Sequence, residues 1–153
     1  MNSYNAIVET QMMIRRPVAK VFRAFTDPAI TTKFWFTKSS GPLETGKTIT
    51  WEWEMYGVSA GVQVLEMVPD QLIATEWGDP ATKVDYIFTA LSPDQTYVVI
   101  KNYGFDLSDD ALLRTVMDST GGFTTVLDGM KAYLEHGIQL NLIADKFPGN
   151  IPS

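Results

Sequence analysis

Residues 113–137 read LRTVMDSTGGFTTVLDGMKAYLEHG, and this stretch determines which fold the rest of the chain must match. Apolar residues and one threonine recur in it three and four positions apart: Leu113, Val116, Thr120, Phe123, Leu127, Met130 and Leu134. This spacing is typical of one face of an α-helix. It predicts one long amphipathic helix, or two nearly coaxial ones, from about Ser108 to about His136, with Gly137 as the cap. Such a helix extends for about 40 Å, so its apolar stripe needs a large partner surface.

Two adjacent glycines, Gly121 and Gly122, lie in the middle of this predicted helix. Each glycine in a helix interior costs about 1 kcal/mol relative to alanine, so the pair opposes the helix by about 2 kcal/mol. Two interpretations follow. The pair marks a kink or a break between two helices, or it brings the helix backbone close to the mouth of a cavity.

The middle of the chain has the alternation of apolar and polar residues that is typical of β-strands. In residues 48–57, TITWEWEMYG, Ile49, Trp51, Trp53 and Met55 alternate with polar residues. Five strand-like stretches follow one another here: residues 48–56, 58–68, 71–77, 83–91 and 96–103. The breaks between them contain Gly, Pro, Asp and Ser, and breaks this short predict antiparallel hairpins.

The first thirty-five residues add a strand and two short helices. Residues 5–14 are a predicted strand, and Pro17 suits the first position of a helix whose apolar face is Val18, Val21, Phe22 and Phe25. Asp27-Pro28 ends this helix and starts another turn or two. The prediction is therefore an α+β fold, in which a curved six-stranded antiparallel sheet surrounds the long C-terminal helix, in a single domain of residues 1–153.

The composition argues against several classes of function. The chain has 12 Lys and Arg against 18 Asp and Glu, for a net charge of −6, and this charge opposes binding to nucleic acids and to anionic membranes. It has no cysteine and a single histidine, so neither a disulfide framework nor a Cys- or His-rich metal site is expected. The N-terminus lacks a signal-peptide pattern and no apolar run reaches about 20 residues, which predicts a cytoplasmic location.

One motif suggests nucleotide binding. Residues 41–48, GPLETGKT, match the phosphate-binding pattern G-x-x-x-x-G-K-[ST]. That loop must lead into a helix whose N-terminus faces the phosphates, but the residues after Lys47 alternate with the period of a strand. Pro42 also removes one N–H from the loop. We therefore expect a loop that leads into a strand, without nucleotide binding.

The order of elements and two stretches resemble a known family. IRRPVAKVFRAFTDPAITTKFW, residues 14–35, and TGGFTTVLDGMKAYLEHG, residues 120–137, are similar to the homologues of the heat-shock protein 90 ATPase activator, in the START-like (Bet v-like) superfamily. The resemblance covers essentially the whole chain. It implies a helix-grip fold and a ligand cavity between the helix and the sheet.

Large side chains on the predicted inner faces are the candidates for lining such a cavity. A sheet and one helix leave space on the concave side, and apolar pockets of this kind bind small molecules. The candidate ligand-binding residues are Trp35, Trp51, Trp53, Trp77, Tyr86, Phe88, Asn102, Phe123, Leu127 and Met130. Six methionines would make such a wall adaptable: Met12, Met13, Met55, Met67, Met117 and Met130. Each of these side chains has an alternative role as filler of a packed core.

Three functions are compatible with these observations. The leading hypothesis is a binding module, without catalytic residues or cofactor, that encloses a small hydrophobic or aromatic molecule. The second is a co-chaperone whose outer surface engages a heat-shock ATPase. The third is an enzyme of the cyclase or aromatase type, which requires polar groups that face the pocket, and Tyr86 and Asn102 are the best candidates. His136 lies in the last helical turn, where the helix dipole favours its charged form.

Overall fold

An antiparallel sheet forms the larger part of the structure, a computed structural model that describes residues 5–149. Its strands in chain order are β1 (Ile7–Ile14), β2 (Lys38–Ser39), β3 (Thr48–Trp53), β4 (Val58–Val68), β5 (Leu72–Trp77), β6 (Thr82–Ser92) and β7 (Gln95–Tyr103). Their order across the sheet is β1-β7-β6-β5-β4-β3-β2. The predicted domain of residues 1–153 extends past both ends of the described part.

All six predicted strands are present, but the predicted number is wrong. Within residues 5–149 the sheet has seven strands, because the two-residue strand β2 pairs with β3 through Lys38 opposite Glu52 and Ser39 opposite Trp51. Two residues are too short for any alternation, so the sequence pattern does not reveal them. Strand β3 also ends three residues before its predicted end, and Met55 lies in the 3-10 helix η1 (Glu54–Tyr56) that follows.

The short helices α1 (Val18–Thr26) and α2 (Pro28–Thr31) follow β1, as predicted. Asp27 separates them, and its side chain accepts a hydrogen bond of 3.0 Å from the Ala29 N–H at the start of α2. This is the usual way in which an aspartate caps a helix N-terminus. A further short helix, α4 (Leu142–Lys146), was not predicted.

The long helix α3 (Asp109–His136) continues without a break through Gly121 and Gly122. The interpretation of the glycine pair as a break between two helices is therefore wrong. Gly137 ends α3 in the left-handed conformation with φ 66°, as predicted for a glycine cap.

The predicted stripe of α3 needs a correction in its N-terminal half. Leu112 is buried there, whereas Leu113 is 59% exposed and Thr120 is also exposed. Leu112 and Leu113 lie four and three residues before Val116, so both satisfy helical spacing, and the pattern alone does not distinguish them. From Phe123 to Met130 the stripe is buried as predicted.

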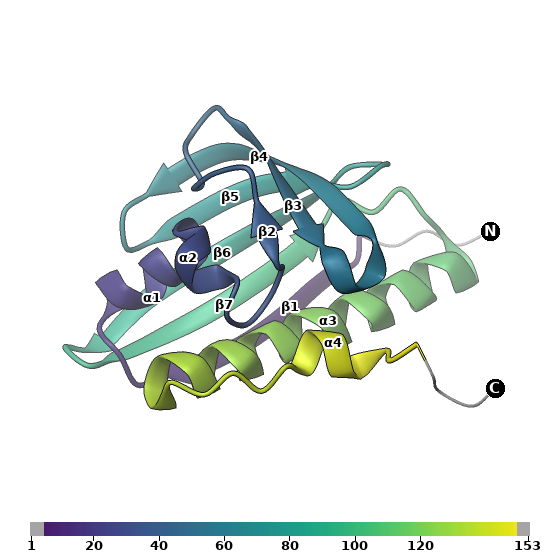
Figure 1. Ribbon diagram of the computed structural model, residues 1–153. Coiled ribbons are helices and arrows are strands. Elements are labelled where there is room, and N and C mark those ends of the chain that lie inside the picture. Colours follow the sequence, from purple (N-terminus) through teal and green to yellow (C-terminus); the bar gives the residue numbers. More distant parts are fainter. Residues whose placement is uncertain (1–4, 150–153) are drawn as a thin grey trace.

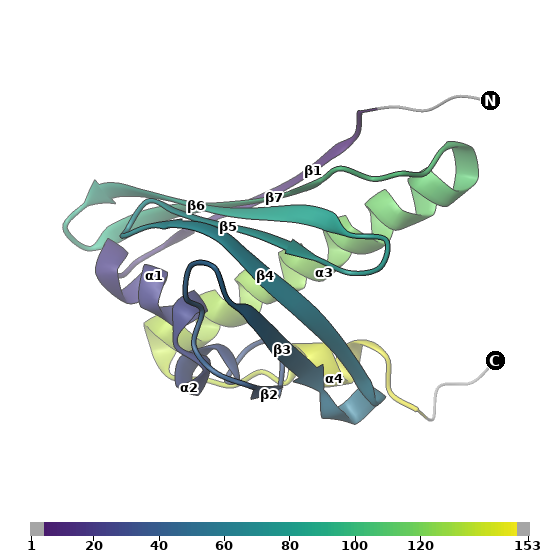
Figure 2. The same ribbon diagram turned by 90° about the horizontal axis from the view of Figure 1, so that it is seen from above.

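All the α-helices lie on the same side of the sheet (Figure 2). Helix α3 runs along the edge strand β1, and α1 packs against β6 and β7 (Figure 1). Strands β3 and β4 curve away from the plane of β6 and β7 and enclose the remaining space (Figure 2). Among residues 5–149 the α-helices pack mainly against β1, β6 and β7, so the space next to β3, β4 and β5 is left to side chains and to a cavity.

A polar cluster joins the C-terminal end of α3 to the end of β1. The Glu135 carboxylate, only 7% exposed, accepts hydrogen bonds from the Arg15 backbone N–H at 2.8 Å and from Lys131 Nζ at 2.6 Å. Lys131 Nζ also donates to the Met13 carbonyl oxygen at 2.8 Å, and Arg16 donates to the Glu135 carbonyl oxygen at 2.7 Å. The cluster thereby fixes the position of α3 along β1.

These contacts favour the charged form of Glu135. Burial of the carboxylate raises its pKa, but the hydrogen bonds from Arg15 and Lys131 and the charges of Lys131 and His136 more than offset this effect. The pKa of Glu135 therefore lies below its ordinary value of 4.5. Because the pKa of Glu135 is lower in the folded state than in the unfolded state, its carboxylate stabilises the folded protein at pH values above 4.5. This contribution is lost as the pH falls through the lowered pKa.

We expect Glu135→Gln to destabilise the protein by about 1 to 3 kcal/mol at neutral pH, because charge-assisted hydrogen bonds are lost. The difference from the original protein should be smaller at an acidic pH, below the lowered pKa of Glu135, than at neutral pH, because Glu135 is then protonated in the original protein as well. Urea unfolding at both pH values measures this. Glu52→Gln, at an exposed pair with Lys38 of 3.9 Å, is the control and should change stability by less than about 0.5 kcal/mol. A loss at Glu135 that does not vary with pH would contradict this role.

Candidate functional site

A large cavity lies between one end of the sheet and α3, with a volume of about 1030 Å³. Its walls are the ends of β3, β4 and β5, the segment 117–126 of α3, and part of residues 138–147, which we call the C-terminal strap. The strap runs back alongside α3 from the end of that helix (Figure 1). The lining residues are Trp35, Trp53, Tyr56, Val58, Ala60, Trp77, Gly78, Asn102, Met117, Asp118, Ser119, Gly121, Gly122, Phe123, Thr125, Val126, Ile143, Lys146 and Phe147.

Trp35, in the loop after α2, occupies the centre of an aromatic cluster at the inner end of the cavity. Its ring centroid lies 4.9 Å from that of Trp51, 6.0 Å from that of Trp77 and 5.9 Å from that of Phe123. These rings meet at interplanar angles of 60° or more, an edge-to-face geometry that is favourable for aromatic pairs. Trp35 therefore separates the cavity from the packed core behind it.

The structure brings half of the predicted ligand-binding residues together on the cavity wall. Trp35, Trp53, Trp77, Asn102 and Phe123 line the cavity. The other five, Trp51, Tyr86, Phe88, Leu127 and Met130, do not line it and are buried in the core. Trp51, for example, stacks on Phe36 with ring centroids 4.4 Å apart. The binding of a ligand by any of these residues stays a prediction.

Several lining residues were not among the predicted site residues. Tyr56 ends η1 and Val58 begins β4, and Ile143, Lys146 and Phe147 come from the C-terminal strap. Alternation along a strand does not show which turn lies near a cavity. The one feature of the sequence that indicated the position of the cavity is the glycine pair. Gly121 and Gly122 both lie on the cavity wall, as the cavity-mouth interpretation predicts.

Asn102 is the polar side chain that the sheet contributes to the wall. Its Nδ2 donates to Thr82 Oγ1 at 3.0 Å and to the Lys83 carbonyl oxygen at 2.9 Å, and its Oδ1 accepts from Ser119 Oγ at 2.7 Å. Both amide hydrogens are therefore used within the protein. Asn102 links β7 to β6 and to α3, which is a structural role.

Tyr86 lies on β6 in the aromatic core, with its ring centroid 5.0 Å from that of Phe25. Its hydroxyl is fully buried and has no hydrogen-bond partner within the described residues. Burial strongly raises the pKa of this phenol. Thr75 has a smaller, opposing effect on the same pKa, but its hydroxyl donates to the Val84 carbonyl oxygen at 2.9 Å. Tyr86 therefore stays protonated and faces packed side chains.

We expect Tyr86→Phe to leave stability unchanged or to raise it by about 1 kcal/mol, because the variant removes a buried hydroxyl without a partner. Thr75→Val is the matched control, since it removes a buried hydroxyl that does make a hydrogen bond, and it should cost about 1 kcal/mol. Denaturant unfolding measures both. A loss of more than about 1 kcal/mol in Tyr86→Phe would show that the hydroxyl contributes to the fold.

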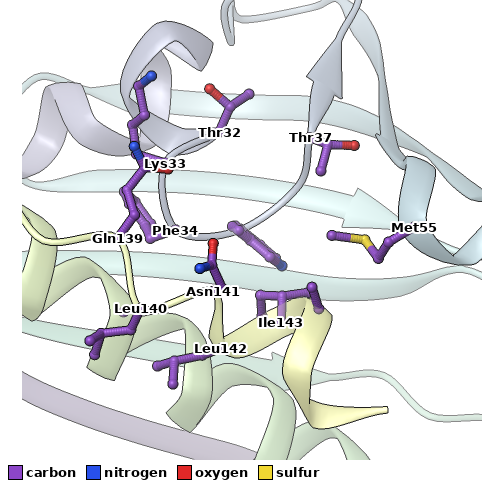
Figure 3. A pocket seen from close by; sticks show the side chains of 13 residues that line it. Thr32, Lys33, Phe34, Thr37, Met55, Gln139, Leu140, Asn141, Leu142 and Ile143 are labelled. Atoms are coloured by element: carbon purple, nitrogen blue, oxygen red, sulfur yellow. The ribbon is translucent and has the colours of Figure 1, made fainter. Parts of the chain in front are cut away.

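A second, smaller cavity of about 190 Å³ lies between the loop after α2 and the C-terminal strap. Its residues Leu140, Leu142 and Ile143 from the C-terminal strap lie opposite Thr32, Thr37 and Met55 (Figure 3). Trp35 and Ile143 line both cavities. Two segments pack closely on Gly129 of α3 here. A Cβ at this position would lie 3.4 Å from Phe34, in the loop after α2, and 3.7 Å from Leu142 of the strap. The large cavity is the better candidate site, since the small one has room only for a molecule about the size of benzene.

Three other features considered in the sequence can be compared with the structure: the loop of residues 41–48, a metal site and a membrane-spanning helix. Lys47 precedes β3, not a helix, and its Nζ pairs with Glu44 at 2.5 Å, so the flanks of residues 41–48 are those of a loop and a strand, as predicted. Among residues 5–149, no group of three or more His, Cys, Asp and Glu side chains is placed to hold a metal ion. No helix in this range has the length and apolar character needed to cross a membrane.

The curved sheet, the long helix and the cavity between them define a helix-grip protein of the START-like class. Comparison with family models agrees with this: residues 15–135 match the model described as Activator of Hsp90 ATPase homolog 1-like protein. The chain belongs to this family. The match ends before the C-terminal strap. A comparison with curated proteins finds no match.

Solved structures share the fold. The protein SSP2350 from Staphylococcus saprophyticus is 30% identical, with a TM-score of 0.78 over 88% of this chain and 96% of the other. The Aha1 dimer from Colwellia psychrerythraea is 17% identical, with a TM-score of 0.73 over 86% and 98% of the two chains. DynU16, described as a putative protein in the dynemicin biosynthetic locus, is 19% identical, with a TM-score of 0.77 over 87% and 48%. The last two similarities concern the fold alone.

Proposed function

We propose that this protein binds a small apolar or aromatic molecule in the large cavity between the sheet and α3. The observation that carries the proposal is the glycine pair on the cavity wall. Gly121 and Gly122 lie inside an unbroken helix, where they cost about 2 kcal/mol relative to two alanines. Because the glycine pair weakens the longest helix of the fold, we expect it to have a function that offsets this loss of stability.

Packing does not require glycine at position 122. A Cβ built there has no atom within 4 Å other than its own chain neighbours and helix backbone, so it would project into open space. A Cβ at position 121 would meet only the end of the Lys146 side chain, at 3.3 Å. Neither φ lies in the left-handed region. Alanine therefore fits at position 122 without any shift and at position 121 after a small shift of the Lys146 side-chain end, and it favours the helix, whereas glycine keeps the cavity wide.

The chemistry of the wall suits an apolar ligand. Trp77 and Phe123 lie side by side with ring centroids 5.7 Å apart, and Trp53 is 6.3 Å from Trp77. The volume of about 1030 Å³ is at the upper end of the range for sites of small molecules. Burial of an apolar ligand against these rings provides the binding energy, and the edge of the cavity is polar through Asn102, Ser119 and Thr125.

The other hypotheses have less support. A cyclase-type enzyme needs an inward-facing group that is free to act, but Tyr86 lies in the core and both amide hydrogens of Asn102 are used. Engagement of a heat-shock ATPase stays a prediction from the family alone, since no surface feature among the described residues favours it. Fold similarity by itself does not establish either activity.

The proposal is tested by titration with N-phenylnaphthylamine, a neutral aromatic dye, followed through dye fluorescence and tryptophan emission. We expect saturable binding to the original protein. Gly122→Ala should raise the stability by about 0.5 to 1 kcal/mol and weaken binding, and Gly122→Leu should weaken it further by filling the cavity. The opposite signs for stability and binding distinguish a functional glycine from a structural one.

Leu113→Ala is the control on the same helix, because Leu113 is exposed and does not line the cavity. Its dye affinity should equal that of the original protein. The absence of saturable dye binding, or equal affinity in the original protein and Gly122→Leu, would refute the proposal.

A further inference from the structure

We propose that the ligand of the large cavity is an amphipathic organic anion, whose charged group binds Lys146 of the C-terminal strap while its apolar body lies against Trp77 and Phe123. This inference rests on the proposed function and adds the ligand class. Lys146 lies outside the part of the chain that the family model matches.

Specific contacts hold the strap over the cavity. The Tyr56 hydroxyl donates a hydrogen bond to the Ile143 carbonyl oxygen, and the Tyr56 and Phe147 rings meet with centroids 6.5 Å apart. Lys146 Nζ donates to Thr125 Oγ1 on α3 at 3.3 Å, across 21 residues of sequence. These contacts bring an ammonium group to the wall of a cavity whose largest lining side chains are apolar.

The ammonium group of Lys146 has capacity left for a ligand. Within residues 5–149 no carboxylate lies within 4.0 Å of Lys146 Nζ, although Asp118 also lines the cavity and Asp145 is its neighbour in sequence. An ammonium has three hydrogen-bond donors, and Thr125 accepts only one. The Thr125 hydroxyl in turn donates to the Gly121 carbonyl oxygen at 2.9 Å, so it accepts from Lys146 without competing for an anion.

Gly121 contributes to the same position. A Cβ there would lie 3.3 Å from Lys146 Nζ, so glycine leaves room beside the ammonium. Phe123 and Trp77 line the same cavity as Lys146. A molecule with one anionic group at Lys146 can therefore extend its apolar part toward Phe123 and Trp77. The net charge of −6 repels anions at a distance, so the local cation is the feature that would select them.

The test compares two dyes that share an aromatic skeleton, anionic anilinonaphthalene sulfonate and neutral N-phenylnaphthylamine, in the full chain. Lys146→Met removes the charge and keeps the length of the side chain, and Lys146→Glu reverses the charge. We expect Lys146→Met to weaken binding of the anionic dye by about threefold to fivefold, since Lys146 is exposed and exposed charge pairs contribute up to about 1 kcal/mol. Lys146→Glu should weaken it more, and binding of the neutral dye should change less than about twofold.

Lys47→Met is the matched control, because it makes the same change in net charge at an exposed site outside the cavity. It should leave the affinity of the anionic dye unchanged, and added salt should reduce the Lys146 effect. If the neutral dye binds but the Lys146 variants weaken both dyes equally or neither, the anion inference is wrong and the proposed function stands. If neither dye binds the original protein, both are wrong.

Discussion

Helix α3 can pack tightly against only part of the sheet, and this geometric constraint determines the rest of the structure. The helix runs along the edge strand β1, where the Glu135 cluster fixes its C-terminal end. The sheet curves away from it toward β3 and β4 (Figure 2). The resulting wedge of space is filled by aromatic rings around Trp35 at its narrow end and stays open at its wide end. The cavity is therefore a consequence of how a straight helix meets a curved sheet.

Under the proposed function, one half of α3 stabilises the fold and the other half borders the binding site. The C-terminal half carries Val126, Leu127 and Met130, which are all buried, and ends in the polar cluster. The segment around Gly121 and Gly122 has low helix propensity, and several of its hydroxyls donate to carbonyl oxygens four residues back, as Thr120 does to Val116 and Thr124 does to Thr120. The packed half provides the stability that allows the other half to border an open cavity.

Most of the fold could be predicted from the sequence, because periodicity reports which side of an element is buried. The alternation in residues 48–53 and the spacing from Phe123 to Met130 are local properties, and both predictions were confirmed. The site was harder. Trp51 and Trp53 share one face of β3, yet only Trp53 lines the cavity, since the position along a strand at which packing ends depends on Trp35 and Phe36 from another segment.

The C-terminal strap could not be predicted for a related reason. Its residues Ile138, Leu140 and Leu142 alternate with Gln139 and Asn141, which is the period of a strand, yet the structure has no strand here and places Leu142 in α4. Their positions depend on contacts with distant residues, such as that of Ile143 with Tyr56. In the sequence, nothing distinguishes Lys146 from other charged residues. Only the structure shows that it lies on the cavity wall.

The most direct test of the central claim, an open cavity that binds an apolar molecule, is methyl NMR of the methionines during titration with N-phenylnaphthylamine. Met117 lines the large cavity, Met55 lines the small one, and Met130 is fully buried in the core. We predict a large, saturable shift of the Met117 methyl signal with direct contacts to the dye, and much smaller changes at Met55 and Met130. An unchanged Met117 signal at saturating dye, or equal shifts at all three methyl groups, would contradict it.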